Sequence, residues 1–70
     1  MNNETWIGDL LIQADPKQVY EGGWTEEYYV IENRDGYTDE TSCHGTGIHA
    51  TKEQAIQACF RLAEQDLLRR

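Results

Sequence analysis

The sequence is poor in the residues that give very small folds extra stability. It holds two cysteines, one proline, one methionine and one phenylalanine among 70 residues. Two cysteines form at most one internal disulfide, so a disulfide-rich secreted scaffold is excluded and we expect reduced thiols. A chain of this length buries only about 60% of its unfolded surface, so a partner subunit would add stability. A homodimer is therefore compatible with the sequence.

Long apolar runs are also lacking. The longest are Leu10 to Ile12 and Tyr28 to Ile31, far below the roughly 20 apolar residues of a membrane-spanning helix. The first four residues carry no basic side chain and lead into no apolar segment. We therefore expect no signal peptide and a cytoplasmic protein.

Basic side chains are scarce, with six Lys and Arg against 13 Asp and Glu and a formal net charge of -7. This balance argues against direct nucleic-acid binding and against binding to anionic membranes. Seven of the acids but only one base, Arg34, lie between Glu21 and Glu40, so this window holds -6 of the charge. An acidic surface suits a partner with a basic surface, although solubility alone is the simpler interpretation.

The end of the chain has the clearest pattern, which predicts a helix from Lys52 to Leu68. Thr51 is placed as its N-cap, and Gln54 completes a capping-box pattern. Apolar residues recur behind it at helical spacing. They are Ala55, Ile56, Cys59, Phe60, Ala63 and Leu67.

The middle of the chain predicts strands. Glu27 to Asn33 is rich in strand formers, and Asn33 to Gly36 is a hairpin-turn pattern. Tyr37 to Cys43 should return antiparallel, as a polar edge strand protected by its charges. Gly45 to Gly47 should break this run, and Ile48 to Ala50 should form a short third strand.

The first part of the chain is ambiguous. Trp6, Leu10 and Ala14 are spaced by four, which suits a short helix within residues 5–14, although a strand also fits. We favour the helix, and Val19 with Tyr20 suggests a further short strand.

The predicted fold class is α+β, as one domain over residues 1–70. A small antiparallel sheet of about three strands is expected under the long C-terminal helix, with a short N-terminal helix besides. The helix stripe should form most of the core, together with Val30 or Ile31 and one tryptophan.

No catalytic motif is recognisable, and we expect no enzyme activity, cofactor or metal. The weak zinc candidates are Cys43, His44, His49 and Cys59, whose spacing differs from that of zinc fingers. Cys59 lies on the apolar helix stripe and should be a buried core residue, while both histidines should lie on the surface. A nucleophilic pair of Cys43 with a histidine is conceivable, but neighbouring strand residues such as Cys43 and His44 point to opposite faces.

The acidic window also contains aromatic residues, which are common at binding hot spots. We predict a docking face for a basic protein partner there. Its candidate residues are Glu21, Trp24, Glu26, Glu27, Tyr28, Tyr29, Glu32, Asp35, Tyr37, Asp39 and Glu40. The alternative is a solvated hairpin whose acids only prevent aggregation.

Two stretches carry a family resemblance, Gly22-Gly23-Trp24 before a strand and His49 to Ile56 opening the helix. They resemble small bacterial and phage domains of unknown function, of the DUF2188 and DUF1508 kind, over residues 22–65. The span between Trp24 and the helix is longer and more acidic here. The resemblance implies a compact α+β fold and supplies no activity and no site.

By size and charge alone, the chain is also similar to phage-encoded inhibitors such as anti-CRISPR proteins, which block a host complex without catalytic residues. The predicted function is therefore a non-enzymatic protein–protein interaction module, an inhibitor from a phage or mobile element that binds a basic, nucleic-acid-handling host complex. The alternatives are a bacterial housekeeping domain and a Cys/His zinc-stabilised module.

Overall fold

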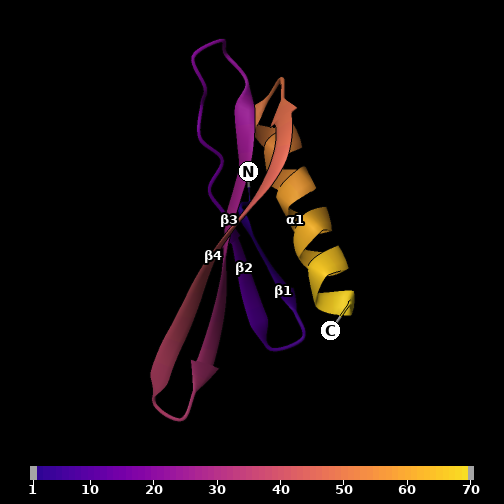
Figure 1. Ribbon diagram of the computed structural model, residues 1–70. Coiled ribbons are helices and arrows are strands. Elements are labelled where there is room, and N and C mark those ends of the chain that lie inside the picture. Colours follow the sequence, from indigo (N-terminus) through magenta and orange to yellow (C-terminus); the bar gives the residue numbers. More distant parts are fainter. Residues whose placement is uncertain (1, 70) are drawn as a thin grey trace.

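The computed structural model describes residues 2–69 as one antiparallel sheet and one helix. The elements are β1 (Glu4–Ile7), β2 (Leu10–Ala14), β3 (Trp24–Arg34), β4 (Tyr37–His49) and α1 (Lys52–Leu68). The strands lie in the order β1-β2-β3-β4, each antiparallel to its neighbour, and α1 packs along one face of the sheet (Figure 1). The α+β class is confirmed. No described segment forms a helix that is long and apolar enough to cross a membrane.

Helix α1 has the predicted bounds. The backbone N–H of Gln54 donates a hydrogen bond of 3.1 Å to Oγ1 of Thr51, so Thr51 is the N-cap. The side chains of Ala55, Ile56, Cys59 and Ala63 on the apolar stripe are buried.

The prediction of a short N-terminal helix is wrong, because residues 4–14 form the β1–β2 hairpin. Trp6 pairs with Leu11, and Ile7 pairs with Leu10. Gly8 directly follows β1 and has a φ of 59°. This left-handed conformation suits a tight turn and does not occur inside a right-handed helix. The sheet therefore has four strands, one more than predicted.

The segment between β2 and β3 contains no strand at Val19 and Tyr20, where one was suggested. Its only bridge joins Gln18 to Trp24, and the Tyr20 side chain is fully exposed. The backbone of Lys17 donates to Oγ1 of Thr25 at 2.9 Å, and the backbone of Thr25 donates to the carbonyl of Lys17 at 2.9 Å. These bonds fasten the start of the segment to β3.

The β3–β4 hairpin turns where the sequence predicts. Asp35 and Gly36 have φ values of 38° and 90°, which is the pattern of a two-residue hairpin turn with two left-handed residues. Arg34 and Tyr37 pair on either side of the turn, and β4 is an edge strand as predicted.

Strand β4 is not broken at Gly45 to Gly47, and Ile48 and His49 are its last residues instead of a separate strand. The pairs Glu27–His44 and Thr25–Ile48 leave Glu26 alone opposite three residues, Gly45 to Gly47. The two glycines therefore form a bulge within a continuous strand, which keeps pairing on both sides.

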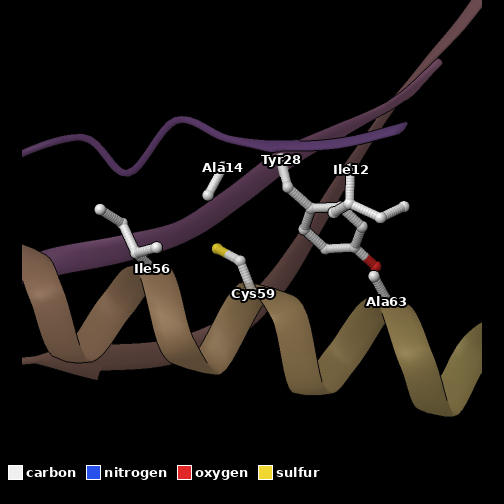
Figure 2. Close-up of a cluster of buried hydrophobic side chains, with 6 residues drawn as sticks. All are labelled: Ile12, Ala14, Tyr28, Ile56, Cys59 and Ala63. Carbon is white, nitrogen blue, oxygen red and sulfur yellow. The ribbon is translucent and has the colours of Figure 1, made fainter. Parts of the chain in front are cut away.

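The core lies between α1 and the central strands β2 and β3. Figure 2 shows the six buried side chains that meet there, and Val30 packs against them as predicted. They are Ile12, Ala14, Tyr28, Ile56, Cys59 and Ala63.

The prediction that one tryptophan belongs to the core is wrong. Trp6 is 62% exposed, because it pairs with Leu11 on the sheet face that points away from the helix. Trp24 is only partly buried, with Nζ of Lys52 lying 5.7 Å from its ring centre. Tyr28 supplies the aromatic ring of the core instead.

Candidate interaction surface

Alternation along β3 divides the predicted docking residues between two faces. Tyr28 faces α1, so Trp24, Glu26 and Glu32 lie on the same side, while Glu27 and Tyr29 lie on the other. We call the side away from α1 the open face. The eleven predicted residues therefore do not form one surface.

Two of the eleven are buried, which corrects the prediction. Tyr28 is 6% exposed and Glu26 is 8% exposed. Burial, with a smaller contribution from Cys43, raises the pKa of Tyr28 to about 12. Neither side chain reaches a partner unless the domain opens.

Glu26 belongs to a polar cluster inside the protein. One carboxylate oxygen accepts a hydrogen bond of 3.2 Å from the backbone N–H of Gly47, and the other lies 2.5 Å from Nε2 of His49. His49 therefore pairs with a buried acid and is only 24% exposed at its side chain, whereas the sequence suggested a surface histidine.

The carboxylate of Glu26 occupies the space beside the bulge in β4 and leaves no room there for larger residues than glycine. A Cβ atom on Gly45 would meet Oε1 of Glu26 and Cδ1 of Leu62, and a Cβ atom on Gly47 would meet the same carboxylate. Neither glycine has a positive φ, so the requirement at both positions is space. Sequence reasoning missed this arrangement, although a Gly-Thr-Gly triplet inside a strand pattern is a signal for a bulge.

The outer part of the β3–β4 hairpin is the most exposed region of the sheet. Every residue from 33 to 42 is exposed, and the hairpin projects away from α1 (Figure 1). Asp35, Tyr37, Asp39 and Glu40 lie in this projecting segment, which we call the acidic hairpin.

Charges on the acidic hairpin are largely unbalanced. Glu32 pairs directly with Asp39 across the strands, an arrangement of like charges that is unfavourable by itself. Nε of Arg34 lies 2.7 Å from Oε1 of Glu32. This hydrogen-bonded contact with Glu32 is the main reason why the pKa of Arg34 is raised, and Asp39 adds a smaller effect. The only Lys or Arg of the acidic hairpin is thus held by Glu32, which lies just before the segment on β3.

Two further predicted residues lie away from the acidic hairpin. Trp24 begins β3, and Glu21 is exposed in the segment before it, so both are at the opposite end of β3 from the turn at Asp35 and Gly36. The structure does not bring them to the acidic hairpin.

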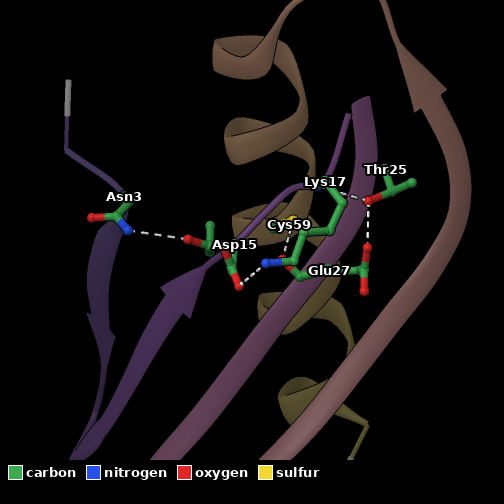
Figure 3. Close-up of polar contacts among 7 residues, drawn as sticks. Asn3, Asp15, Lys17, Thr25, Glu27 and Cys59 are labelled. Atoms are coloured by element: carbon green, nitrogen blue, oxygen red, sulfur yellow. Dashed lines mark hydrogen bonds and ion pairs between the residues drawn. The ribbon is translucent and has the colours of Figure 1, made fainter. Parts of the chain in front are cut away.

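The open face carries Glu27 and Tyr29, and a hydrogen bond holds the carboxylate of Glu27 in place. Oγ1 of Thr25 donates a hydrogen bond of 2.6 Å to Oε2 of Glu27, as Figure 3 shows. In the same view, Nζ of Lys17 contacts Oδ2 of Asp15 at 2.8 Å. Lys17 is therefore already engaged by an acid of its own segment.

The cysteine and histidine candidates are dispersed. Cys59 is buried as predicted, and its Sγ donates to the backbone carbonyl of Glu27 at 3.4 Å (Figure 3). Burial raises the pKa of its thiol to about 11, which makes it a poor nucleophile and a poor metal ligand. Cys43 pairs with Tyr28 on the helix side, whereas the exposed His44 pairs with Glu27 on the open face. Within residues 2–69, no three His, Cys, Asp or Glu side chains are grouped to hold a metal.

Comparisons of the chain with family models, with curated proteins and with solved structures give no match. The family resemblance noted from the sequence stays a prediction.

Proposed function

We propose that the protein is a non-enzymatic interaction module that binds a protein partner with a basic surface through the acidic hairpin. The observation that carries this proposal is the exposure of every residue from 33 to 42 in a segment that holds Asp35, Asp39 and Glu40 against Arg34 alone. Charge supports a partner of this kind, because proteins that hold nucleic acid present strongly basic surfaces. Inhibition of a nucleic-acid-handling complex in the bacterial cytoplasm is the role that fits best.

The shape of the acidic hairpin supports this proposal. Isolated two-stranded hairpins are marginally stable in water, and this one extends beyond the helix that covers the rest of the sheet. Its carboxylates lie on the turn, at Asp35, and on β4, where Asp39 and Glu40 point to opposite faces, so a basic groove can contact them from either side. A narrow, negatively charged ribbon of this kind can occupy a groove that normally receives a phosphate backbone.

The test is affinity capture by the tagged full chain from bacterial lysate at low and at high salt, with mass spectrometry. The decisive variant is Asp39→Lys with Glu40→Lys, because both side chains are exposed and Glu26 remains untouched. The matched control is Glu53→Lys with Glu64→Lys, which changes the net charge equally on exposed positions of α1.

The proposal predicts one dominant partner with a basic nucleic-acid channel. Its capture should fall steeply with salt and with the hairpin substitutions, and should persist with the helix substitutions. Equal capture by both double variants, or capture that is indifferent to salt, would refute it. The hairpin acids would then serve only to protect the β4 edge.

A further inference from the structure

The open face of the sheet carries an apolar row. Cross-strand pairing places Trp6 beside Leu11, and Leu11 beside Ile31, so the row runs across β1, β2 and β3. Tyr29 lies two residues from Ile31 on the same face and pairs with Gln13. Among the described residues, no second helix or sheet covers this face. We call Trp6, Leu11, Tyr29 and Ile31 the apolar row.

Apolar side chains on the open face are unusual for such a sheet, and of the four Trp6 is exposed while Leu11, Tyr29 and Ile31 are half-buried. An antiparallel sheet with one helix layer normally presents polar side chains on its other face. Other open-face positions here follow that rule, such as Asn33 and Thr38 near the turn. Trp6 nevertheless remains 62% exposed. Contiguous apolar side chains that include an exposed tryptophan are typical of docking surfaces.

The charges around the apolar row identify the kind of occupant. The charged open-face positions of the strands are Glu4, Glu27 and Glu40, and the strands' only Lys or Arg, Arg34, lies on the helix side. Lys17, in the segment before β3, lies near Glu27 and Tyr29, but its charge is matched by Asp15. A second copy stacked on this face would bring acids against acids. A segment that presents apolar side chains flanked by Lys or Arg complements both features.

The apolar row is also continuous with the acidic hairpin. Ile31 pairs directly with Glu40, so the row ends on β4 at one of the hairpin acids. A partner that contacts the hairpin from the open side therefore reaches the apolar row without any rearrangement of the sheet.

We propose that the open face docks an amphipathic basic segment of a protein partner, with Trp6 as its apolar anchor. This inference rests on the proposed function, since it assumes the same basic partner, and it adds an apolar contact that the acidic hairpin does not provide.

The test uses two synthetic peptides of equal charge, one with alternating Lys and Leu and one with alternating Lys and Ser. The full chain carries Trp24→Phe, which leaves Trp6 as its only tryptophan. The Lys–Leu peptide should bind at least about tenfold more tightly than the Lys–Ser peptide and should shift the Trp6 emission to shorter wavelength.

Titration calorimetry then compares Trp6→Ser with Tyr20→Ser in the wild-type chain. Both positions are exposed, so both variants should fold, and Tyr20 lies outside the open face. Trp6→Ser should weaken binding of the Lys–Leu peptide about tenfold, while Tyr20→Ser should leave it unchanged.

The outcomes separate this inference from the proposed function. If Asp39→Lys with Glu40→Lys weakens binding of both peptides and Trp6→Ser weakens neither, the acidic hairpin binds and the docking role of the open face is refuted. If neither peptide binds, the docking role is refuted as well, and lysate capture decides the proposed function separately. Self-association that Trp6→Ser abolishes would identify a second copy as the occupant and would also overturn the inference.

Discussion

Replacement of Gly47 by alanine tests why the bulge in β4 requires glycine. The three heavy atoms nearest to the added Cβ atom would all belong to the carboxylate of Glu26. The carboxylate must then leave its position, and it loses the hydrogen bond from the backbone of Gly47 and the contact with His49. Hydrogen bonds to charged groups contribute roughly 1.5–3 kcal/mol each.

The size of the effect follows from these contacts. Alanine also restricts the unfolded chain, which by itself stabilises a protein by about 0.4–1 kcal/mol. We therefore expect Gly47→Ala to lower the free energy of unfolding by at least about 2 kcal/mol, the lower limit that these contributions leave. For a domain of this size that corresponds to a melting temperature lower by ~10 °C.

The matched experiment repeats the substitution in a chain that already carries Glu26→Ala. The obstructing carboxylate is then absent, so Gly47→Ala should be neutral or stabilising by about 0.4–1 kcal/mol. Urea unfolding of the wild type, the two single variants and the double variant gives the coupling directly. An equal cost of Gly47→Ala in both backgrounds would refute the view that Glu26 requires the glycine.

Three further predictions concern the helix and the core. Thr51→Ala removes the hydrogen bond at the N-cap of α1 and should cost about 1 kcal/mol in urea unfolding, whereas Thr46→Ala, at an exposed strand position, should cost less. Ile56→Ala leaves a cavity in the core and should cost about 2–5 kcal/mol by the same measurement; a loss below that range would mean that the helix repacks. Alkaline pH should destabilise the protein, because burial raises the pKa of Cys59 from 9.0 to about 11. The unfolded chain loses its proton first, so stability is complete below about pH 9 and falls as the pH approaches about 11, by roughly 2 kcal/mol. Cys59→Ala should flatten this part of the pH profile of urea unfolding, and an unchanged profile would contradict the assignment.

The helix and the hairpin turn could be predicted because their signals are local. Thr51 and Gln54 mark the start of α1 by direct interaction across one turn, and Asp35-Gly36 supplies the left-handed residues of a two-residue turn. Neither signal depends on contacts with distant parts of the chain.

The N-terminal hairpin was missed because its sequence fits two periodicities. Trp6 and Leu10 are spaced as on a helix, yet pairing of β2 with β3 determines the outcome and places them on opposite faces of the sheet. The exposed Trp6 could not be foreseen for the same reason, since its side of the sheet depends on that pairing.

The candidate site was only partly predictable. The acidic hairpin lies where the charge pattern indicated. The burial of Glu26 depends on a contact with His49, 23 residues further along the chain, and on the space that Gly47 leaves. The apolar row likewise combines residues of three strands, which sequence spacing alone does not bring together.

The order of the strands in the sheet has a consequence for folding during synthesis. Every strand pairs with its neighbour in the chain, so both hairpins require only local contacts, which form quickly. The core face of the sheet, however, is covered by α1, which follows all four strands in the chain and leaves the ribosome after them. Until Ile56 and Cys59 emerge, Ile12 and Tyr28 have no helix to pack against, so the nascent sheet exposes its core face. The domain should therefore acquire most of its stability in one late step, when α1 docks.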